Sequence, residues 1–265
     1  MARVATHHVV FFSGGASSWA AGKRVAEWYG PENVTLLFTD TLIEDEDLYR
    51  FLEEAAADIG VPITKLADGR DPWKVFRDVR MIGNSRIDPC SKILKRDLAW
   101  KWVAKNCHPD THDLHFGYDP FEVDRLEGTK RARPEWTIRA PLAESPMLFR
   151  GDIFKSLEDQ GIAVPRLYTL GFAHNNCGGF CVKAGHGHFA TLLEQLPDRY
   201  RYHEEKEEEM RQFLRKDVAI MRDRTGGRTR PLTLREFRRR KEQGAEVDRS
   251  DIGGCDCFSA PEEVV

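Results

Sequence analysis

Apolar runs alternate with helix-like repeats along the first two thirds of the chain. The run Val9–Phe12 is followed by apolar residues at mixed three- and four-residue spacing as far as Tyr29, where Gly30 ends the pattern. The runs Val34–Phe38 and Pro62–Leu66 each precede a segment with the same helical spacing. Strands that alternate with helices are typical of a mostly parallel sheet that helices cover on both faces.

The alternation continues beyond residue 90 with less regular spacing. The pattern predicts a helix over Cys90–Val103, a fourth strand at Leu114–Gly117, a fifth at Ile138–Leu142 and an extended piece at Leu167–Phe172. Helices are also expected at 72–79 and 152–160, and an ordered loop or short helix at 118–133. We therefore expect an α/β fold built on a mostly parallel, five-stranded sheet.

The last third of the chain has a different composition. Long, highly charged helical stretches follow residue 185: residues 204–209 are mostly acidic, and arginine is frequent over 222–241. Thr233 and Glu236 have the spacing of a capping box, which predicts the start of a helix directly after Thr233. The expected division is an α/β domain, residues 1–185, and a charged helical C-terminal extension, residues 186–265.

Composition limits the possible classes of protein. The 265 residues include 40 lysines and arginines against 43 aspartates and glutamates, a formal net charge of −3, so only local clusters can favour nucleic-acid binding. No apolar run reaches the roughly 18 residues of a membrane span, and the N-terminus lacks the pattern of a signal peptide. We expect a cytoplasmic protein without a membrane partner. Its six cysteines then favour metal or redox chemistry over structural disulfides.

A loop of small residues follows the first strand. Ser13, Gly14 and Gly15 carry so little side-chain bulk that their backbone N–H groups can converge on an anion at the N-terminus of the next helix. Ser17 and Ser18 add hydroxyl donors. The SGGxxS spacing differs from the Walker loop, because no Gly-Lys-Ser/Thr triplet occurs in the chain. The loop predicts a phosphate site, with a turn that only joins strand to helix as the alternative.

In their order, these motifs resemble the PP-loop superfamily, which comprises the N-type ATP pyrophosphatases and the related phosphoadenylylsulfate (PAPS) reductases. The Asp40-Thr41 ending of the second strand and the Gly117-x4-Glu122-x2-Arg125 spacing after the fourth strand match that superfamily. The segment Gly161–Gly171 is similar to the one that leads into the cysteine motif of the family. The resemblance covers about residues 8–185 and implies an adenine nucleotide α-hydrolase-like fold.

The resemblance implies an enzyme that cleaves ATP between its α and β phosphates. The loop would hold the β and γ phosphates, the strand edge near Phe38 would approach the adenosine, and Mg²⁺ would neutralise the pyrophosphate leaving group. The family usually carries Asp where this chain has Ser17, so Asp40 is the carboxylate expected to help. The expected nucleotide-binding residues are Ser13, Gly14, Gly15, Ala16, Ser17, Ser18, Phe38, Asp40 and Gly117. The expected catalytic residues are Ser13, Ser18, Asp40 and Arg125.

Three cysteines form the second chemical signal. Cys177 and Cys181 flank a glycine-rich turn that lets two thiolates face one centre, and Cys90 begins the predicted helix over 90–103. Together they resemble the three-cysteine iron–sulfur sites of some tRNA and DNA sulfur-transfer enzymes, which implies a [4Fe–4S] cluster with one iron open to a sulfur donor. Zn²⁺ is the alternative metal, for which Cys257 of the terminal CxC sequence would be a fourth ligand. Unliganded thiols are the remaining interpretation.

Three functions are compatible with these motifs. The favoured one is an ATP pyrophosphatase that adenylates a nucleic acid so that sulfur can replace an oxygen, as in DNA phosphorothioation or tRNA thiolation. The class implies a cysteine desulfurase as the sulfur donor. DNA is favoured over tRNA because no tRNA-binding domain precedes the loop, and the basic stretch 222–241 offers a place for a phosphate backbone. The alternatives are a PAPS or adenylylsulfate reductase and a non-catalytic nucleotide-binding module.

Overall fold

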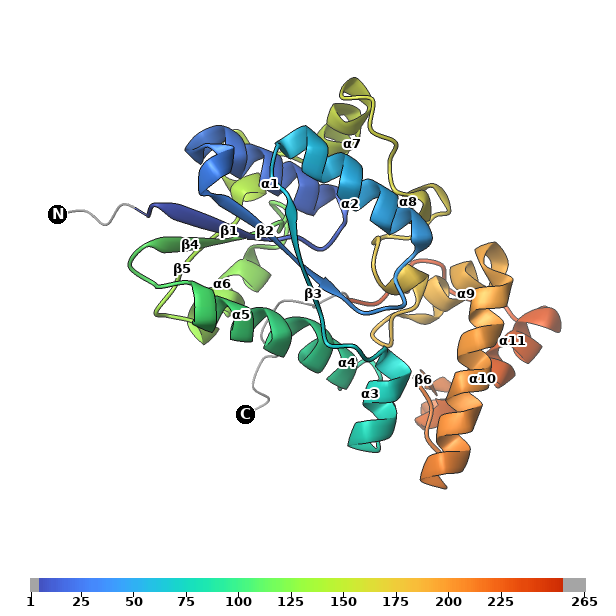
Figure 1. Cartoon of the computed structure of the whole chain (residues 1–265). Coiled ribbons are helices and arrows are strands. Elements are labelled where there is room, and N and C mark those ends of the chain that lie inside the picture. Colours follow the sequence, from blue (N-terminus) through green and yellow to red (C-terminus); the bar gives the residue numbers. More distant parts are fainter. Residues whose placement is uncertain (1–4, 255–265) are drawn as a thin grey trace.

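Five parallel strands form the central sheet of the computed structural model, which describes residues 5–254 (Figure 1). The strands are β1 (His7–Phe11), β2 (Val34–Asp40), β3 (Ile63–Ala67), β4 (His112–Phe116) and β5 (Thr137–Arg139). They lie in the order β3-β2-β1-β4-β5, and each neighbouring pair is parallel. The strand order therefore reverses beside β1. In open α/β sheets, ligands bind outside the carboxyl ends of the strands at such a reversal.

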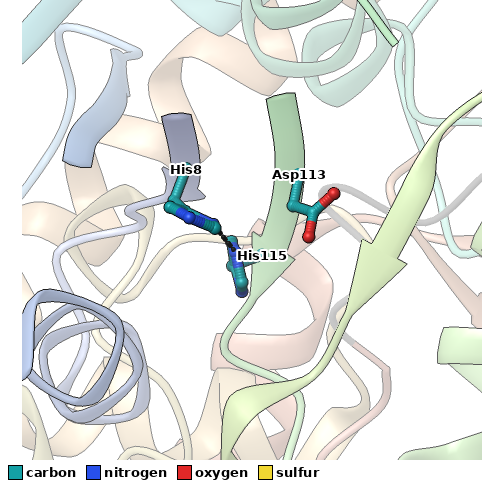
Figure 2. Close-up of side chains that lie close together, drawn as sticks. All are labelled: His8, Asp113 and His115. Atoms are coloured by element: carbon teal, nitrogen blue, oxygen red, sulfur yellow. Dashed lines mark hydrogen bonds between the residues drawn. The ribbon is translucent and has the colours of Figure 1, made fainter. Parts of the chain in front are cut away.

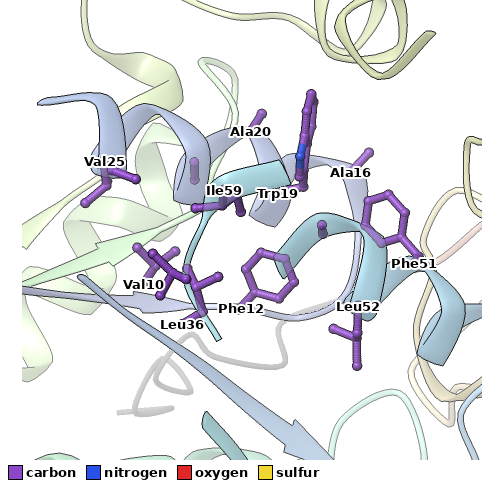
Figure 3. Packing of buried hydrophobic residues seen from close by; sticks show 14 of the residues in the cluster. Val10, Phe12, Ala16, Trp19, Ala20, Val25, Leu36, Phe51, Leu52 and Ile59 are labelled. Carbon is purple, nitrogen blue, oxygen red and sulfur yellow. The ribbon is translucent and has the colours of Figure 1, made fainter. Parts of the chain in front are cut away.

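Helices cover both faces of this sheet, which confirms the predicted α/β class (Figure 1). The helices α1 (Ala16–Tyr29), α2 (Glu46–Ile59) and α7 (Arg150–Asp159) pack on one face, and α5 (Leu98–Asn106) packs on the other. Side chains alternate along β1, so Val10 and Val9 belong to opposite hydrophobic cores. Figure 3 shows Val10 and Phe12 packed with Trp19 of α1 and Phe51 of α2.

Most of the predicted helices are confirmed. The helix expected at 72–79 is α3 (Pro72–Val79), and the loop or short helix at 118–133 contains α6 (Val123–Ala132). The helix expected over 90–103 begins at α4 (Pro89–Ser91), continues through a π-helical segment, η2 (Lys92–Asp97), and ends in α5. Within residues 5–254, no helix combines the length and the apolar character needed to span a bilayer.

Two segments expected to be extended are helical instead. Leu167–Phe172 contains most of the short helix α8 (Arg166–Thr169), which begins directly after Pro165. The fifth strand is shorter than predicted, because Pro141–Ala143 form a 3-10 turn, η3. The Pro141 carbonyl in that turn accepts a hydrogen bond from the Arg24 guanidinium at 2.8 Å. In both places a proline with its fixed φ favours a turn, which the apolar run does not reveal.

The C-terminal part packs into a hydrophobic cluster that it shares with α3 and with residues 177–181, which we call the cysteine loop. Its elements are α9 (His186–Gln195), α10 (Pro197–Leu214), β6 (Met221–Asp223), β7 (Arg230–Leu232) and α11 (Leu234–Glu242). The predicted helix start is confirmed, because Thr233 Oγ1 accepts a hydrogen bond from the Glu236 N–H at 3.1 Å. Trp73 of α3 donates to the buried His203 of α10 at 3.0 Å, so this part is joined to the α/β part through its core. The boundary near residue 185 stays a prediction.

Two buried histidines bridge β1 and β4 within the sheet. Figure 2 shows His8 and His115 facing each other, with Nδ1 of His8 3.1 Å from Nε2 of His115. Burial lowers the pKa of His115 to about 3 and also lowers the pKa of His8, so both rings are neutral at pH 7 and one donates to the other. With Asp113 they form the one group of three potential metal ligands within 4.8 Å in residues 5–254. Their hydrogen bond accounts for the short distance between the two imidazoles.

A buried carboxyl group joins α10 to two later segments of the C-terminal part by hydrogen bonds. Glu207 on α10 accepts hydrogen bonds from the backbone N–H groups of Ile220 at 2.9 Å and Leu234 at 2.6 Å. Burial raises the pKa of Glu207 from its ordinary 4.5 to about 7. The folded protein therefore holds this proton more tightly than the unfolded chain does. The resulting stabilisation is fully present below about pH 4.5 and is lost as the pH rises through about 7.

We predict that titration of Glu207 lowers the free energy of unfolding by about 3 kcal/mol between acidic pH and about pH 8. Glu207→Gln removes this part of the pH dependence, because the amide does not titrate. Glu205→Gln, at an exposed position of the same helix, retains it and is the matched control. Urea unfolding at a series of pH values measures the effect. A pH profile of Glu207→Gln that equals the wild-type profile contradicts the prediction.

Candidate functional site

A cavity of about 160 Å³ lies at the carboxyl ends of β1 and β4, where the strand order reverses. Its walls come from the loop after β1, the loop after β4, α7 and the segment 173–176. The predicted site residues that line it are Ser13, Gly15, Ala16, Ser17, Ser18, Gly117 and Arg125. The reversal thus brings together two motifs that lie far apart in the sequence.

The loop after β1 has the conformation that its small residues predict. Gly14 has φ +77°, which only glycine adopts without strain, and Gly15 is the N-cap of α1. Ser18 Oγ donates to the Gly15 carbonyl at 2.8 Å and accepts from the Gly15 N–H at 3.2 Å. Ser13 Oγ lies 3.4 Å from Ser18 Oγ. Hydroxyls and N–H groups at the start of a 14-residue helix therefore border the cavity, which is favourable for an anion.

The hydroxyl of Tyr168 lies at the same helix N-terminus. It accepts a hydrogen bond from the Ala16 N–H at 3.3 Å. A Cβ at position 15 would come within 2.9 Å of this hydroxyl, which is why Gly15 fits there. The guanidinium of Arg150 lies over the Tyr168 ring, 4.9 Å from its centroid. The tyrosine oxygen therefore accepts the hydrogen bond of the Ala16 N–H. An anion bound at this helix N-terminus would compete with it for that N–H.

The end of β4 approaches α1 closely. A Cβ at Gly117 would lie 3.0 Å from the carbonyl oxygen of Ser17, so a larger residue would force the strand and the helix apart. Arg125 forms an ion pair with Glu122, and its guanidinium lies 4.7 Å from the Tyr118 ring centroid. The Gly-x4-Glu-x2-Arg spacing therefore supplies a close backbone approach and both signs of charge to one wall of the cavity.

Residues 173–176 close the cavity from a third side. Asn175 is 1% exposed, and its Nδ2 donates to the Gly14 carbonyl at 2.8 Å. Its Oδ1 has no hydrogen-bond partner among the residues that the structure describes, so it is a buried acceptor beside the cavity. Burial, with Arg125 nearby, lowers the pKa of His174 to about 4, so this imidazole is neutral at pH 7. An N–H of a ligand therefore has two candidate acceptors here.

Asp40 and Phe38 lie on β2, outside the set of residues that line this cavity. The Phe38 side chain is buried in the core with α1 and α2. The buried Asp40 carboxylate accepts hydrogen bonds from Tyr49 Oη at 3.0 Å and Leu42 N–H at 2.8 Å, and it pairs with Lys65 of β3 at 2.7 Å. Its oxygens are engaged within the protein, so contact of Asp40 with a metal ion or a nucleotide stays a prediction.

A second cavity, of about 20 Å³, brings together the three predicted cysteines. Cys90 of α4 lines it, and so do Cys177 and Cys181 at the two ends of the glycine-rich turn. Lys95 of η2 and Lys183 line the same cavity and contribute positive charge. Cysteines from two distant segments thus line one cavity, and their role as ligands stays a prediction.

A buried acidic residue attaches the cysteine loop to the end of β2. Glu44 accepts hydrogen bonds from Thr41 Oγ1 at 2.8 Å and from the Cys177 N–H. Lys95 is 4% exposed, and its Nζ lies 3.7 Å from Glu44 Oε1. Burial raises the pKa of Glu44, and the Lys95 charge opposes that effect. The cysteine loop therefore has a fixed position relative to the sheet.

The three cysteines of the second cavity do not have the spacing of ligands to one metal ion. In a [4Fe–4S] cluster, each cysteine binds a different iron, so the ligands stand farther apart than those of one ion. Within residues 5–254 the three sulfur atoms do not form a set within 4.8 Å of one another, the spacing that one ion would require. Cys257, the predicted fourth zinc ligand, and Cys255 lie outside the described residues.

Sequence reasoning did not identify Tyr168, Arg150, Asn175 or His174 as site residues. Tyr168, His174 and Asn175 occur within ten residues before Cys177. A polar segment directly before a cysteine motif was the one available signal, since polar loops carry binding residues more often than buried elements do. Arg150 gave no signal, because it lies at the start of an ordinary amphipathic helix.

We predict that Tyr168→Phe strengthens binding of pyrophosphate about fivefold. An anion must displace the hydroxyl from the Ala16 amide, and losing one such hydrogen bond costs about 1 kcal/mol. Tyr202→Phe, a phenylalanine substitution at an exposed position of α10, leaves the affinity unchanged. Isothermal titration calorimetry measures both. Weaker binding by Tyr168→Phe would mean that the hydroxyl helps to hold the anion.

Comparisons with known proteins find no family model that matches the chain and no similar curated protein. Among solved structures, the chain is similar to a phosphoadenylyl-sulfate (PAPS) reductase from Candida auris in its phosphate complex, with a TM-score of 0.43 and 15% identity over 63% of this chain and 77% of that one. It is also similar to an NH3-dependent NAD synthetase from Campylobacter jejuni subsp. jejuni, with a TM-score of 0.38 and 12% identity over 92% and 89% of the two chains. Both likenesses are distant in sequence and in structure.

Proposed function

We propose that this chain is a PP-loop ATP pyrophosphatase that adenylates a nucleic acid for sulfur insertion. One observation carries the proposal: the SGGxxS loop and the Gly117-x4-Glu122-x2-Arg125 motif line a single cavity at the strand reversal. A turn that only joined a strand to a helix would not need the close approach of Gly117 to Ser17. The arrangement supports a phosphate-rich ligand at the N-terminus of α1.

In the proposed reaction, an oxygen of the nucleic acid attacks the α-phosphorus of ATP. The bond between the α and β phosphates breaks, and pyrophosphate leaves. The N–H groups and hydroxyls of the Ser13–Ser18 loop hold the terminal phosphates, where negative charge increases in the transition state. Arg125 and Arg150 line the same cavity and stabilise that charge. The buried Oδ1 of Asn175 accepts a hydrogen bond from the nucleotide.

Two carboxylates of the cavity fit Mg²⁺. Asp119 and Glu122 border it together with the hydroxyls of Ser13 and Ser17, and Mg²⁺ prefers oxygen ligands. When bound, Mg²⁺ neutralises charge on the leaving pyrophosphate. We therefore assign the metal-holding role to Asp119, and Glu122 would join it on leaving its ion pair with Arg125. Asp40, which the resemblance favoured, is engaged by Tyr49, Leu42 and Lys65.

Cys90, Cys177 and Cys181 hold the [4Fe–4S] cluster in this proposal. When bound, the cluster supplies an open iron for a sulfur ligand, the chemistry that sulfur insertion requires. The segment from Asn175 to Cys177 connects the two cavities, because it is bonded to the Gly14 carbonyl at one end and to Glu44 at the other. The adenylation and sulfur sites therefore keep a fixed separation. A cysteine desulfurase is the proposed sulfur donor, and DNA the first acceptor to test.

We predict that the chain releases pyrophosphate from ATP when Mg²⁺ and duplex DNA or bulk tRNA are present. Gly15→Ala lowers the rate at least about tenfold, because its Cβ would lie among the loop groups that border the cavity, 3.6 Å from Ser13 Oγ, and would take up space that the phosphates need. Gly128→Ala is the matched control, since a Cβ there meets no atom closer than 3.9 Å. A coupled pyrophosphate assay measures the rates.

Incubation with PAPS and a thiol distinguishes the alternative functions. Sulfite release without pyrophosphate release from ATP identifies a sulfonucleotide reductase. Binding of ATP without either reaction identifies a non-catalytic nucleotide-binding module. Either result contradicts the proposed adenylation.

We predict that the protein, purified or reconstituted without oxygen, contains iron and acid-labile sulfide and absorbs broadly in the visible range. Cys90→Ser, Cys177→Ser and Cys181→Ser each lose most of that absorption, because every one of them removes a ligand. Cys107→Ser is the control, since Cys107 lies at the end of α5 and does not line the second cavity. Elemental analysis checks the metal. Full occupancy by zinc without iron would exclude the cluster.

A further inference from the structure

A short hairpin extends from the C-terminal part of the molecule. β6 and β7 pair antiparallel, and the turn 225–227 joins them. At the base of the hairpin, Met221 lies opposite Leu232, and both side chains are buried in the cluster shared with α3. Residues 224–230 are exposed. The hairpin is therefore anchored at its base, with its tip in solvent.

Four arginines lie on this hairpin without a counter-charge. The side chains of Arg222, Arg224, Arg228 and Arg230 form no ion pair or hydrogen bond with any residue in the described range 5–254. The acidic residue of the hairpin, Asp223, is already engaged by Arg240 of α11 at 2.7 Å. The hairpin therefore presents four positive charges to an external partner.

The arginines of the neighbouring helix are paired. Arg238 of α11 contacts Glu204 at 2.8 Å, and Arg239 contacts Glu236 at the same distance. Along the sequence, the basic stretch 222–241 is one continuous block. In the folded chain, its unpaired charge is concentrated on the hairpin, and its helical half is largely neutralised.

Two further arginines enlarge this basic surface. Arg77 and Arg80, at the end of α3, lie over the ring of Phe213 near the end of α10, at 4.4 and 5.1 Å from its centroid. Figure 1 shows these helix ends beside β6, and Phe213 packs in the same cluster as Met221. Positive charge thus gathers at one end of a chain whose net charge is −3. Such an asymmetric distribution orients a polyanion as it approaches.

We propose that the β6–β7 hairpin binds duplex DNA by inserting into the major groove and contacting phosphates on both sides. This inference rests on the proposed function, because it provides the surface that a nucleic-acid acceptor needs. A two-stranded ribbon fits the major groove of B-DNA, which is about 12 Å wide, whereas the major groove of A-form RNA is too deep and narrow. Guanidinium groups bind phosphate oxygens through paired N–H donors. Such contacts position the duplex without reading its sequence.

The test measures anisotropy of a short fluorescent DNA duplex over a series of salt concentrations. Four phosphate contacts give a slope of about −4 for log K against log salt concentration. Arg224→Gln/Arg228→Gln reduces that slope by about 2 and weakens binding, and Arg222→Gln/Arg230→Gln is a second pair with the same expectation. Arg235→Gln/Arg239→Gln, which removes two paired and similarly exposed charges from α11, changes neither quantity.

Three results contradict the hairpin proposal. The first is an equal loss of DNA affinity in the hairpin variants and the α11 variant. The others are binding of duplex RNA or single-stranded DNA as tightly as duplex DNA, and the absence of DNA binding at low salt. Circular dichroism and pyrophosphate affinity check that each variant is folded with an intact loop. Pyrophosphate release from ATP is scored separately. If the protein binds DNA as expected but does not release pyrophosphate, only the proposed function is contradicted. If it releases pyrophosphate but the hairpin substitutions do not affect DNA binding, only the hairpin proposal is contradicted.

Discussion

The close approach of β4 to the N-terminus of α1 is the contact on which the candidate site depends. Parallel pairing of β1 with both β2 and β4 makes the carboxyl ends of β1 and β4 neighbours. Gly117 then meets the backbone of Ser17 so closely that a Cβ at this position would lie 3.0 Å from the Ser17 carbonyl oxygen. Because of that contact, the helix N-terminus, the loop hydroxyls and Arg125 border the same cavity and can act on one ligand.

A single segment couples this cavity to the cysteines. Asn175 holds the Gly14 carbonyl, and two residues later the Cys177 N–H donates to Glu44 at the end of β2. Both anchors are buried, and closely packed interiors transmit displacement rather than absorb it. A change at the Ser13–Ser18 loop is therefore expected to reach the thiols through a few covalent bonds. Under the proposed function, this segment couples adenylation to sulfur delivery.

Ion pairing between side chains, more than amino-acid composition, decides which charges can act on an external partner. The His8–His115 pair is neutral, and Glu44 forms an ion pair with Lys95. Glu204 and Glu236 form ion pairs with arginines of α11. Unpaired positive charge is then found on the β6–β7 hairpin and at the end of α3. The chain has a net charge near zero, yet the hairpin carries a local excess of positive charge, and this excess carries the proposal for DNA binding.

The residue pattern alone determined the α/β class, the glycine-dependent loop and the start of α11, because periodicity, backbone freedom and capping act within a few residues. It also indicated that Cys90, Cys177 and Cys181 belong together, through resemblance. Only the tertiary structure decided the strand order, the contacts of Tyr168 and Asn175 with the loop, the engagement of Asp40 and the division of the basic stretch. Each of these depends on contacts between residues far apart in the chain, and no local pattern encodes which distant partner a side chain meets.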